Sequence, residues 1–267
     1  MSVNLLLVTD REMEKWSEGG FPARTLRSDA DLREAFHEPA QSRRPVIWIA
    51  HHASQLSPLA DQVPLLRPNH RLLLLGETKG VERDLLQVIF RIVVAPGTGM
   101  HILPAEELRE VLAAPHRDEL FVGGVVDHAN RLVVLFRGTL EPVVVTFGWF
   151  ERRNPTPRPD FANFEVTDYG QTVRLGEYEA TADVILYVHD TEYRRRAKER
   201  ELKHDPSFGA ALRRLRLLRA VRRDDFPGIS EKQIARLERG ESTRPHPRTL
   251  ASIAERLGVD PAEIETY

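Results

Sequence analysis

The feature that most constrains the fold is a set of short apolar runs in the first 115 residues that do not alternate with polar residues. Strands of this kind are buried on both faces, which is typical of a parallel sheet covered by helices. Stretches with helical periodicity separate the runs. Residues 1–115 are therefore predicted to form an α/β domain. The candidate strands are Val3–Thr9, Pro45–Ala50, Arg71–Gly76 and Arg91–Ala95.

This first segment resembles a flavodoxin-like or receiver-like domain. A phosphoreceiver needs an acidic cluster after its first strand, an Asp after its third and a Lys after its last. Asp10 and Glu12 can stand for the first cluster. The strand Pro45–Ala50, which corresponds to the receiver's third strand, is followed by two histidines, and Ala95 takes the place of the Lys. The resemblance therefore implies a degenerate receiver that serves dimerisation or partner binding. No P-loop or dinucleotide fingerprint follows any strand, so nucleotide binding has no support.

Residues 116–190 change to apolar and polar residues in alternation, which is typical of antiparallel strands. Three strands are expected in 119–150, and two more in 164–187 with a turn at Asp168–Gln171. The segment is predicted to be a β-rich domain of unknown function. Its second half resembles a small uncharacterised bacterial module that also occurs ahead of DNA-binding domains, and this resemblance implies no particular chemistry.

Charge is distributed unevenly along the chain. Residues 191–267 carry 18 Lys and Arg against 13 Asp and Glu, whereas the rest carries 20 against 27. A basic tail on an acidic body indicates a polyanionic partner for the tail, although random surface variation is the alternative. Residues 191–206 are expected to form a basic helical linker. Its cations either belong to a solvated helix face or contact phosphates beside the next domain.

The last segment, 207–267, has the most specific local pattern. "SFGAALRRLRLLR" predicts a helix that Ser207 caps, and the break at Pro227-Gly228 precedes a second capped helix. Ser230 and Gln233 have the spacing of a capping box, in which each side chain bonds the backbone N–H of the other residue. Gly240 is placed to end this helix. The sequence therefore predicts an all-helical C-terminal domain, and the whole chain is predicted to be an α+β multidomain protein.

The string "LRRLRLLR…GISEKQIARLERGE…PHPRTLASIAERLGV" closely resembles the Cro/lambda-repressor (XRE-type) helix-turn-helix family. The match runs from Phe208 to Ile264, and Glu238 and Gly240 fall on the family's "ErG" signature. The resemblance implies a domain that binds double-stranded DNA. The chain is shorter than the family pattern between the first helix and "GIS", so the second helix, "RRDDF", is expected to be truncated.

The resemblance also implies how helix 231–239 meets the major groove. Glu231, Lys232 and Arg236 are expected to reach base edges, because Arg and Lys donate to guanine and Glu accepts from cytosine. Ser230 is expected to contact phosphate at the helix N-terminus. Gln233 either reads adenine or holds the backbone. The predicted phosphate contacts that set the register are Arg239, Arg244 and Arg248.

The sequence gives little support to an enzyme, a metal-binding protein or a membrane protein. There is no cysteine, which excludes disulfides and thiolate nucleophiles, and no nucleophile elbow or close histidine ligand pattern is present. His51-His52 at a strand end is either a metal-ligand pair or a plain loop pair. We expect no enzyme activity, no metal and no cofactor. The short apolar runs and the absence of a signal-like start predict a soluble, cytoplasmic protein without a membrane partner.

Together these observations predict a bacterial-type, sequence-specific transcriptional regulator. It is expected to be a repressor and to bind double-stranded DNA as a homodimer. The alternative is an antitoxin-like or defence-associated interaction subunit, whose residues 1–190 bind a partner protein. The predicted segments are 1–115, 116–190, the linker 191–206 and the DNA-binding domain 207–267.

Overall fold

The computed structural model describes residues 4–9, 13–17, 20–37, 45–60, 69–97, 99–152, 155–241 and 245–264. The chain divides into two compact units, Met1–Thr191 and Glu192–Tyr267. We call them the sheet unit and the helical unit. The predicted fold class is confirmed: a parallel α/β part is followed by an antiparallel part and then by a helical part. Residues of both predicted segments, 1–115 and 116–190, lie in the sheet unit.

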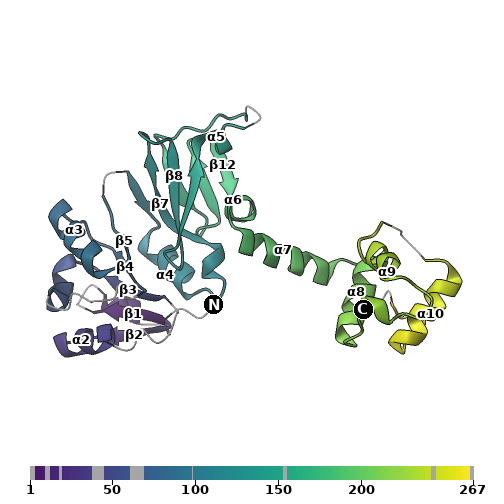
Figure 1. Ribbon diagram of the computed structural model, residues 1–267. Helices are drawn as coiled ribbons and strands as arrows, with labels where there is room; N and C mark the ends of the chain where they lie inside the picture. The colour runs from purple at the N-terminus through teal and green to yellow at the C-terminus, as the bar shows by residue number, and fades with distance from the viewer. Residues whose placement is uncertain are drawn as a thin grey trace. The chain divides into compact units, whose positions relative to one another are not determined.

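The first part of the sheet unit is a five-stranded parallel sheet with the strand order β2-β1-β3-β4-β5. Its inner strands are largely apolar on both sides, and Leu72, Leu73 and Leu74 are all fully buried, whereas the edge strand β2 is only partly buried. This is the burial that the non-alternating runs predict. The strands (Figure 1) are β1 (Asn4–Val8), β2 (Ala23–Leu26), β3 (Val46–Ala50), β4 (His70–Leu74) and β5 (Ile92–Val94).

Helices cover one face of this sheet through a single apolar cluster. Phe36 and Leu86, from two of the helices, pack in the cluster with Trp48 and Leu72 of the strands. The amphipathic pattern of these helices is what brings them onto the sheet. The elements around the sheet are α1 (Glu14–Ser17), α2 (Asp29–His37), the 3-10 helix η1 (Ala53–Leu59) and α3 (Gly80–Ile89).

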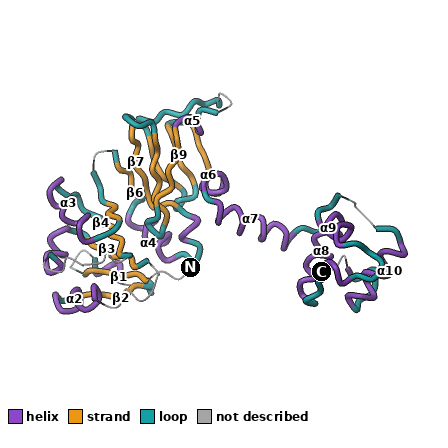
Figure 2. The backbone as a smooth tube through the Cα atoms, viewed as in Figure 1, coloured by secondary structure: helices purple, strands orange, loops and turns teal. Residues whose placement is uncertain are grey.

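The second part of the sheet unit is antiparallel. A four-stranded sheet has the order β6-β7-β8-β9, and a three-stranded sheet has the order β10-β11-β12. Figure 2 shows the orange strands of this part side by side. The strands are β6 (Met100–Ile102), β7 (Phe121–Asp127), β8 (Leu132–Arg137), β9 (Pro142–Thr146), β10 (Phe164–Thr167), β11 (Thr172–Leu175) and β12 (Tyr178–Thr181). The helices are α4 (Ala105–Ala113), η2 (Arg117–Glu119), α5 (Phe147–Phe150) and α6 (Ala182–His189).

The prediction of two strands in 164–187 is wrong. This stretch forms the three short strands β10–β12 and then helix α6, which contains the apolar "DVILY". The ladder between β11 and β12 ends where Thr172 pairs with Thr181, so the chain beyond Thr181 has no remaining residue of β11 to pair with. A helix satisfies the backbone there and buries Ile185 and Leu186.

The helical unit packs its helices around one core. Phe208, Leu212 and Leu215 contact Ile234 and further apolar residues in a single cluster. Its elements are α7 (Thr191–His204), which begins at the boundary, α8 (Phe208–Leu218), the 3-10 helix η3 (Arg223–Asp225), α9 (Glu231–Glu238) and α10 (Pro247–Leu257). Across the described part of the chain, no helix has the length and apolar character that crossing a membrane requires.

Candidate nucleic-acid interface

The N-terminus of α9 is fixed by its own side chains. The Ser230 hydroxyl accepts a hydrogen bond from the Gln233 N–H at 3.3 Å, and the Gln233 side-chain carbonyl accepts from the Ser230 N–H at 2.9 Å. The predicted capping box is therefore confirmed. The Gln233 amide oxygen is thus held by the Ser230 backbone, and the role of this side chain in DNA binding stays a prediction.

The C-terminus of α9 is equally well defined. Gly240 has a φ of +70°, the left-handed conformation that glycine adopts without strain. The Gly240 N–H donates to the Leu237 carbonyl at 3.0 Å, and the Glu241 N–H donates to the Arg236 carbonyl at 3.1 Å. These two bonds form a Schellman motif, which satisfies the last carbonyls of the helix. Gly240 thus ends α9 as predicted.

The segment before α9 is short. The predicted truncation of the second helix is confirmed, since η3 is a single 3-10 turn of three residues. Helix α8 then lies close to α9 at Gly209, where a Cβ atom would stand 2.3 Å from the Leu237 carbonyl oxygen. Only a glycine permits this approach, so the position of α9 is set by backbone contact with α8.

A buried ion cluster holds the inner side of α9, and sequence reasoning missed it. The Glu238 side chain is 1 % exposed and pairs with Arg216 of α8 and with Arg223 of η3. Arg223 donates to Glu238 from Nε at 2.8 Å and from a terminal nitrogen at 2.7 Å. Arg216 also donates to the Val221 carbonyl at 2.9 Å. We call these residues, Arg216, Arg223 and Glu238, the buried ion cluster; it ties three helices together.

One signal for the cluster lay in the sequence. Arg216 stands four residues after Leu212, on the apolar face of α8, where a cation needs an interior partner. The Arg216 side chain is buried and paired with Glu238. Arg213 and Arg214, on the same helix, are half-buried.

The outer side of α9 presents the side chains predicted to read bases. Glu231, Lys232 and Arg236 are all exposed. Arg236 and Arg239 both donate to Glu241, from Nε at 3.1 Å and from Nε at 2.6 Å respectively. This part of the surface is therefore polar, and Ile234 and Leu237 keep it oriented by packing into the core on the opposite side.

Two predicted phosphate contacts lie beyond α9. Arg248 is exposed in the first turn of α10, and its backbone N–H donates to His246 Nδ1 at 3.4 Å. Arg244 lies outside the described residues. The structure therefore brings Ser230, Glu231, Lys232, Gln233, Arg236 and Arg239 onto one short helix and its caps, with Arg248 on the next helix.

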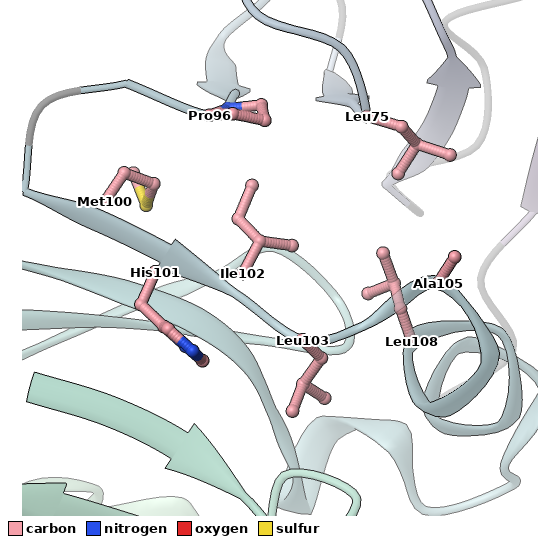
Figure 3. A pocket seen from close by; sticks show the side chains of 8 residues that line it. All are labelled: Leu75, Pro96, Met100, His101, Ile102, Leu103, Ala105 and Leu108. Atoms are coloured by element: carbon pink, nitrogen blue, oxygen red, sulfur yellow. The ribbon is translucent and has the colours of Figure 1, made fainter.

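The sheet unit contains an apolar cavity of 330 Å³ beyond the ends of β4 and β5. Figure 3 shows Met100 and Ile102 of β6 on the side of Pro96 and Leu75, whereas the His101 side chain points to the other side of the strand. His101 Nδ1 accepts the Val166 N–H at 3.1 Å, and burial lowers its pKa. This histidine lines the cavity, and its ring has a structural partner in the Val166 backbone.

The other sequence candidates of the sheet unit are an acidic pair and a histidine pair. Asp10 and Glu12, the predicted acidic cluster, lie outside the described residues. His51 and His52 follow β3, and His51 Nδ1 is 2.8 Å from His52 Nε2. In the ranges that the structure describes, no three His, Asp or Glu side chains gather as metal ligands would.

Comparison with known proteins agrees with this geometry in the helical unit. Residues 207–266 match the family model of the helix-turn-helix domain. No curated protein and no solved structure matches the chain. The C-terminal part of the chain thus contains a helix-turn-helix domain, and α8, η3, α9 and α10 lie within the matched residues. Such a domain suggests that the protein binds DNA.

Proposed function

We propose that the protein is a sequence-specific transcriptional regulator of the Cro/lambda-repressor type, which represses its target by binding double-stranded DNA. Helix α9 enters the major groove, where an α-helix fits and each base pair offers a distinct pattern of donors and acceptors. The observation that carries the proposal is that α9 is held rigidly against the rest of the helical unit. Its caps and the buried ion cluster fix the helix, while Glu231, Lys232 and Arg236 remain exposed.

Each exposed group has a role that its chemistry supports. Lys232 and Arg236 donate to guanine, and Glu231 accepts from cytosine. The N-terminus of α9 and the exposed Arg239 and Arg248 favour phosphate oxygens, which set the position of the helix without reading sequence. Because phosphate contacts release counterions, binding should weaken steeply with salt. The proposal includes no catalytic step.

We propose that the regulator acts as a homodimer, because helix-turn-helix domains of this kind bind half-sites about one helical turn apart. Support for a protein contact in the sheet unit comes from α3. Val81, Leu85 and Val88 are spaced along one face of this helix and are 74 %, 63 % and 47 % exposed. The same face also supports the second candidate, an interaction subunit of the antitoxin-like or defence-associated kind, which binds a partner protein through residues 1–190.

The test is selection of duplexes from a random-sequence pool by the full chain, followed by binding measurements. We expect one common sequence to be enriched. Lys232→Ala and Arg236→Ala should each cost about 1–3 kcal/mol on that duplex and relax the preference at one position. The matched control is Lys198→Ala on α7, which changes charge equally away from α9 and should keep the preference. Enrichment of no sequence would contradict the regulator and favour the second candidate.

A further inference from the structure

Glu241 lies directly beyond α9 and is held in place by its backbone. Its N–H closes the Schellman motif on the Arg236 carbonyl, so its Cα has a defined position relative to the last turn of the helix. Its two carboxylate oxygens accept hydrogen bonds from two different arginines. One oxygen accepts from Arg239 Nε at 2.6 Å, and the other accepts from Arg236 Nε at 3.1 Å.

The two arginines are bound in the same way. Each is engaged at Nε, and within the described residues neither guanidinium has a hydrogen bond from its two terminal nitrogens. The side chains of Arg236 and Arg239 are 59 % and 56 % exposed, so these nitrogens can meet a ligand. Hydrogen bonds from Arg239 and then Arg236 hold the pKa of Glu241 below its ordinary value, which keeps the carboxylate charged.

This geometry restricts what an arginine can recognise. A guanidinium presents its N–H groups in one rigid plane. When a carboxylate occupies Nε, the end that carries the two terminal nitrogens stays available for a ligand. That end carries donors directed toward two acceptors in one plane, and guanine O6 and N7 are such a pair in the major groove. Holding a long side chain in place before binding also lowers the entropy lost on binding.

We propose that Glu241 is a positioning residue for DNA recognition, which orients Arg236 to contact a guanine with its two terminal nitrogens and directs Arg239 toward the backbone phosphates. The inference rests on the proposed function. This positioning role explains how Glu241 contributes to sequence preference although it is an anion beside a polyanionic ligand. Without this role, the carboxylate would act only by repelling phosphate and would weaken binding to all sequences alike.

The experiment measures the affinity of the full chain for two duplexes. One is the duplex that the unchanged chain enriches most from a random pool, and the other is a shuffled duplex of the same base composition. Glu241→Gln removes the charge while keeping the size of the side chain. The matched control is Glu255→Gln, which makes the same change at an exposed position of α10. The thermal midpoint should not move, because exposed ion pairs contribute little to stability.

We expect Glu241→Gln to lower the ratio of the two affinities about tenfold, since one bidentate base contact is lost. Its affinity for the shuffled duplex should rise, and Glu255→Gln should keep the ratio. In an Arg236→Ala chain, Glu241→Gln should leave the ratio unchanged, because the two residues act through one contact.

The inference is overturned if Glu241→Gln shifts both affinities by the same factor, or if it lowers the ratio equally in the Arg236→Ala chain. The first result would mean that Glu241 only repels phosphate, and the second that it acts without Arg236. The proposal that the protein binds DNA would stand in both cases. If the unchanged chain prefers no duplex, the proposed function fails first and the inference falls with it.

Discussion

The two compact units bury polar side chains in different ways. In the sheet unit, His70 is 3 % exposed and its Nδ1 has no hydrogen-bond partner among the described residues, while Arg71 beside it donates to the Thr139 carbonyl. In the helical unit, the buried Arg216 and Glu238 neutralise each other as an ion pair. The sheet unit also contains an ion pair, Arg137 with Asp190, but in addition it buries His70 with a ring nitrogen that has no partner in the described part of the chain, whereas the helical unit buries its charge together with a partner.

This difference indicates where each unit is sensitive. A buried ion pair is costly to break, because the remaining charge has no partner in a medium of low dielectric constant. A buried neutral histidine instead makes folding depend on pH, because the unfolded chain binds a proton that the folded chain excludes. All three tryptophans, at positions 16, 48 and 149, belong to the sheet unit. Tryptophan fluorescence therefore reports on that unit alone, whereas far-UV circular dichroism reports on both.

The largest effect is expected at the buried ion cluster. Glu238→Ala leaves Arg216 buried without a carboxylate and should lower the free energy of unfolding of the helical unit by about 3–5 kcal/mol. In urea, the circular dichroism transition of this unit should move to lower denaturant, while the tryptophan fluorescence transition should stay in place. Glu255→Ala, on the exposed side of α10, is the matched control and should change the free energy by less than about 0.5 kcal/mol. A shift of the fluorescence transition would contradict the independence of the two units.

A smaller effect is expected at His70. Burial lowers the pKa of His70 from 6.5 to about 4. Between these values the unfolded chain binds a proton and the folded chain does not, so the sheet unit should lose stability as the pH falls from 6.5 toward 4. The denaturant midpoint of tryptophan fluorescence measures this loss directly.

His101 and His189 also have lowered pKa values and act in the same direction. The control is therefore His70→Phe, which removes one titrating group while keeping a ring beside Phe36 and Trp48. Its midpoint should depend less on pH in this range than that of the unchanged chain. Equal pH dependence in both chains would show that His70 does not carry the effect.

The sequence predicted α9 well because its signals are local. Ser230, Gln233 and Gly240 lie within one segment and form a cap at each end through bonds to nearby backbone. Four of the five parallel strands were predictable for a similar reason, since runs such as "RLLLLG" have no polar face, whereas the edge strand β2, "ARTL", was not predicted. Both patterns depend on residues close together in the chain.

What the sequence did not predict depends on residues far apart. Pairing of Arg216 with Glu238 requires α8 to cross α9 at Gly209, and no local pattern specifies that crossing. The helix that contains "DVILY" forms because β11 ends at Thr172, and an apolar run by itself is compatible with a strand or a helix. The strand pairing and the helix packing decided these cases.

The central claim is that α9 reads base edges in the major groove. The most direct test replaces guanine by 7-deazaguanine at each position of the duplex that the full chain selects. This change removes the N7 acceptor from the major groove and leaves base pairing and the minor groove intact. We predict that one such replacement weakens binding of the unchanged chain by about 1–3 kcal/mol and has no effect on the Arg236→Ala chain. Binding that is insensitive to every replacement would contradict the claim.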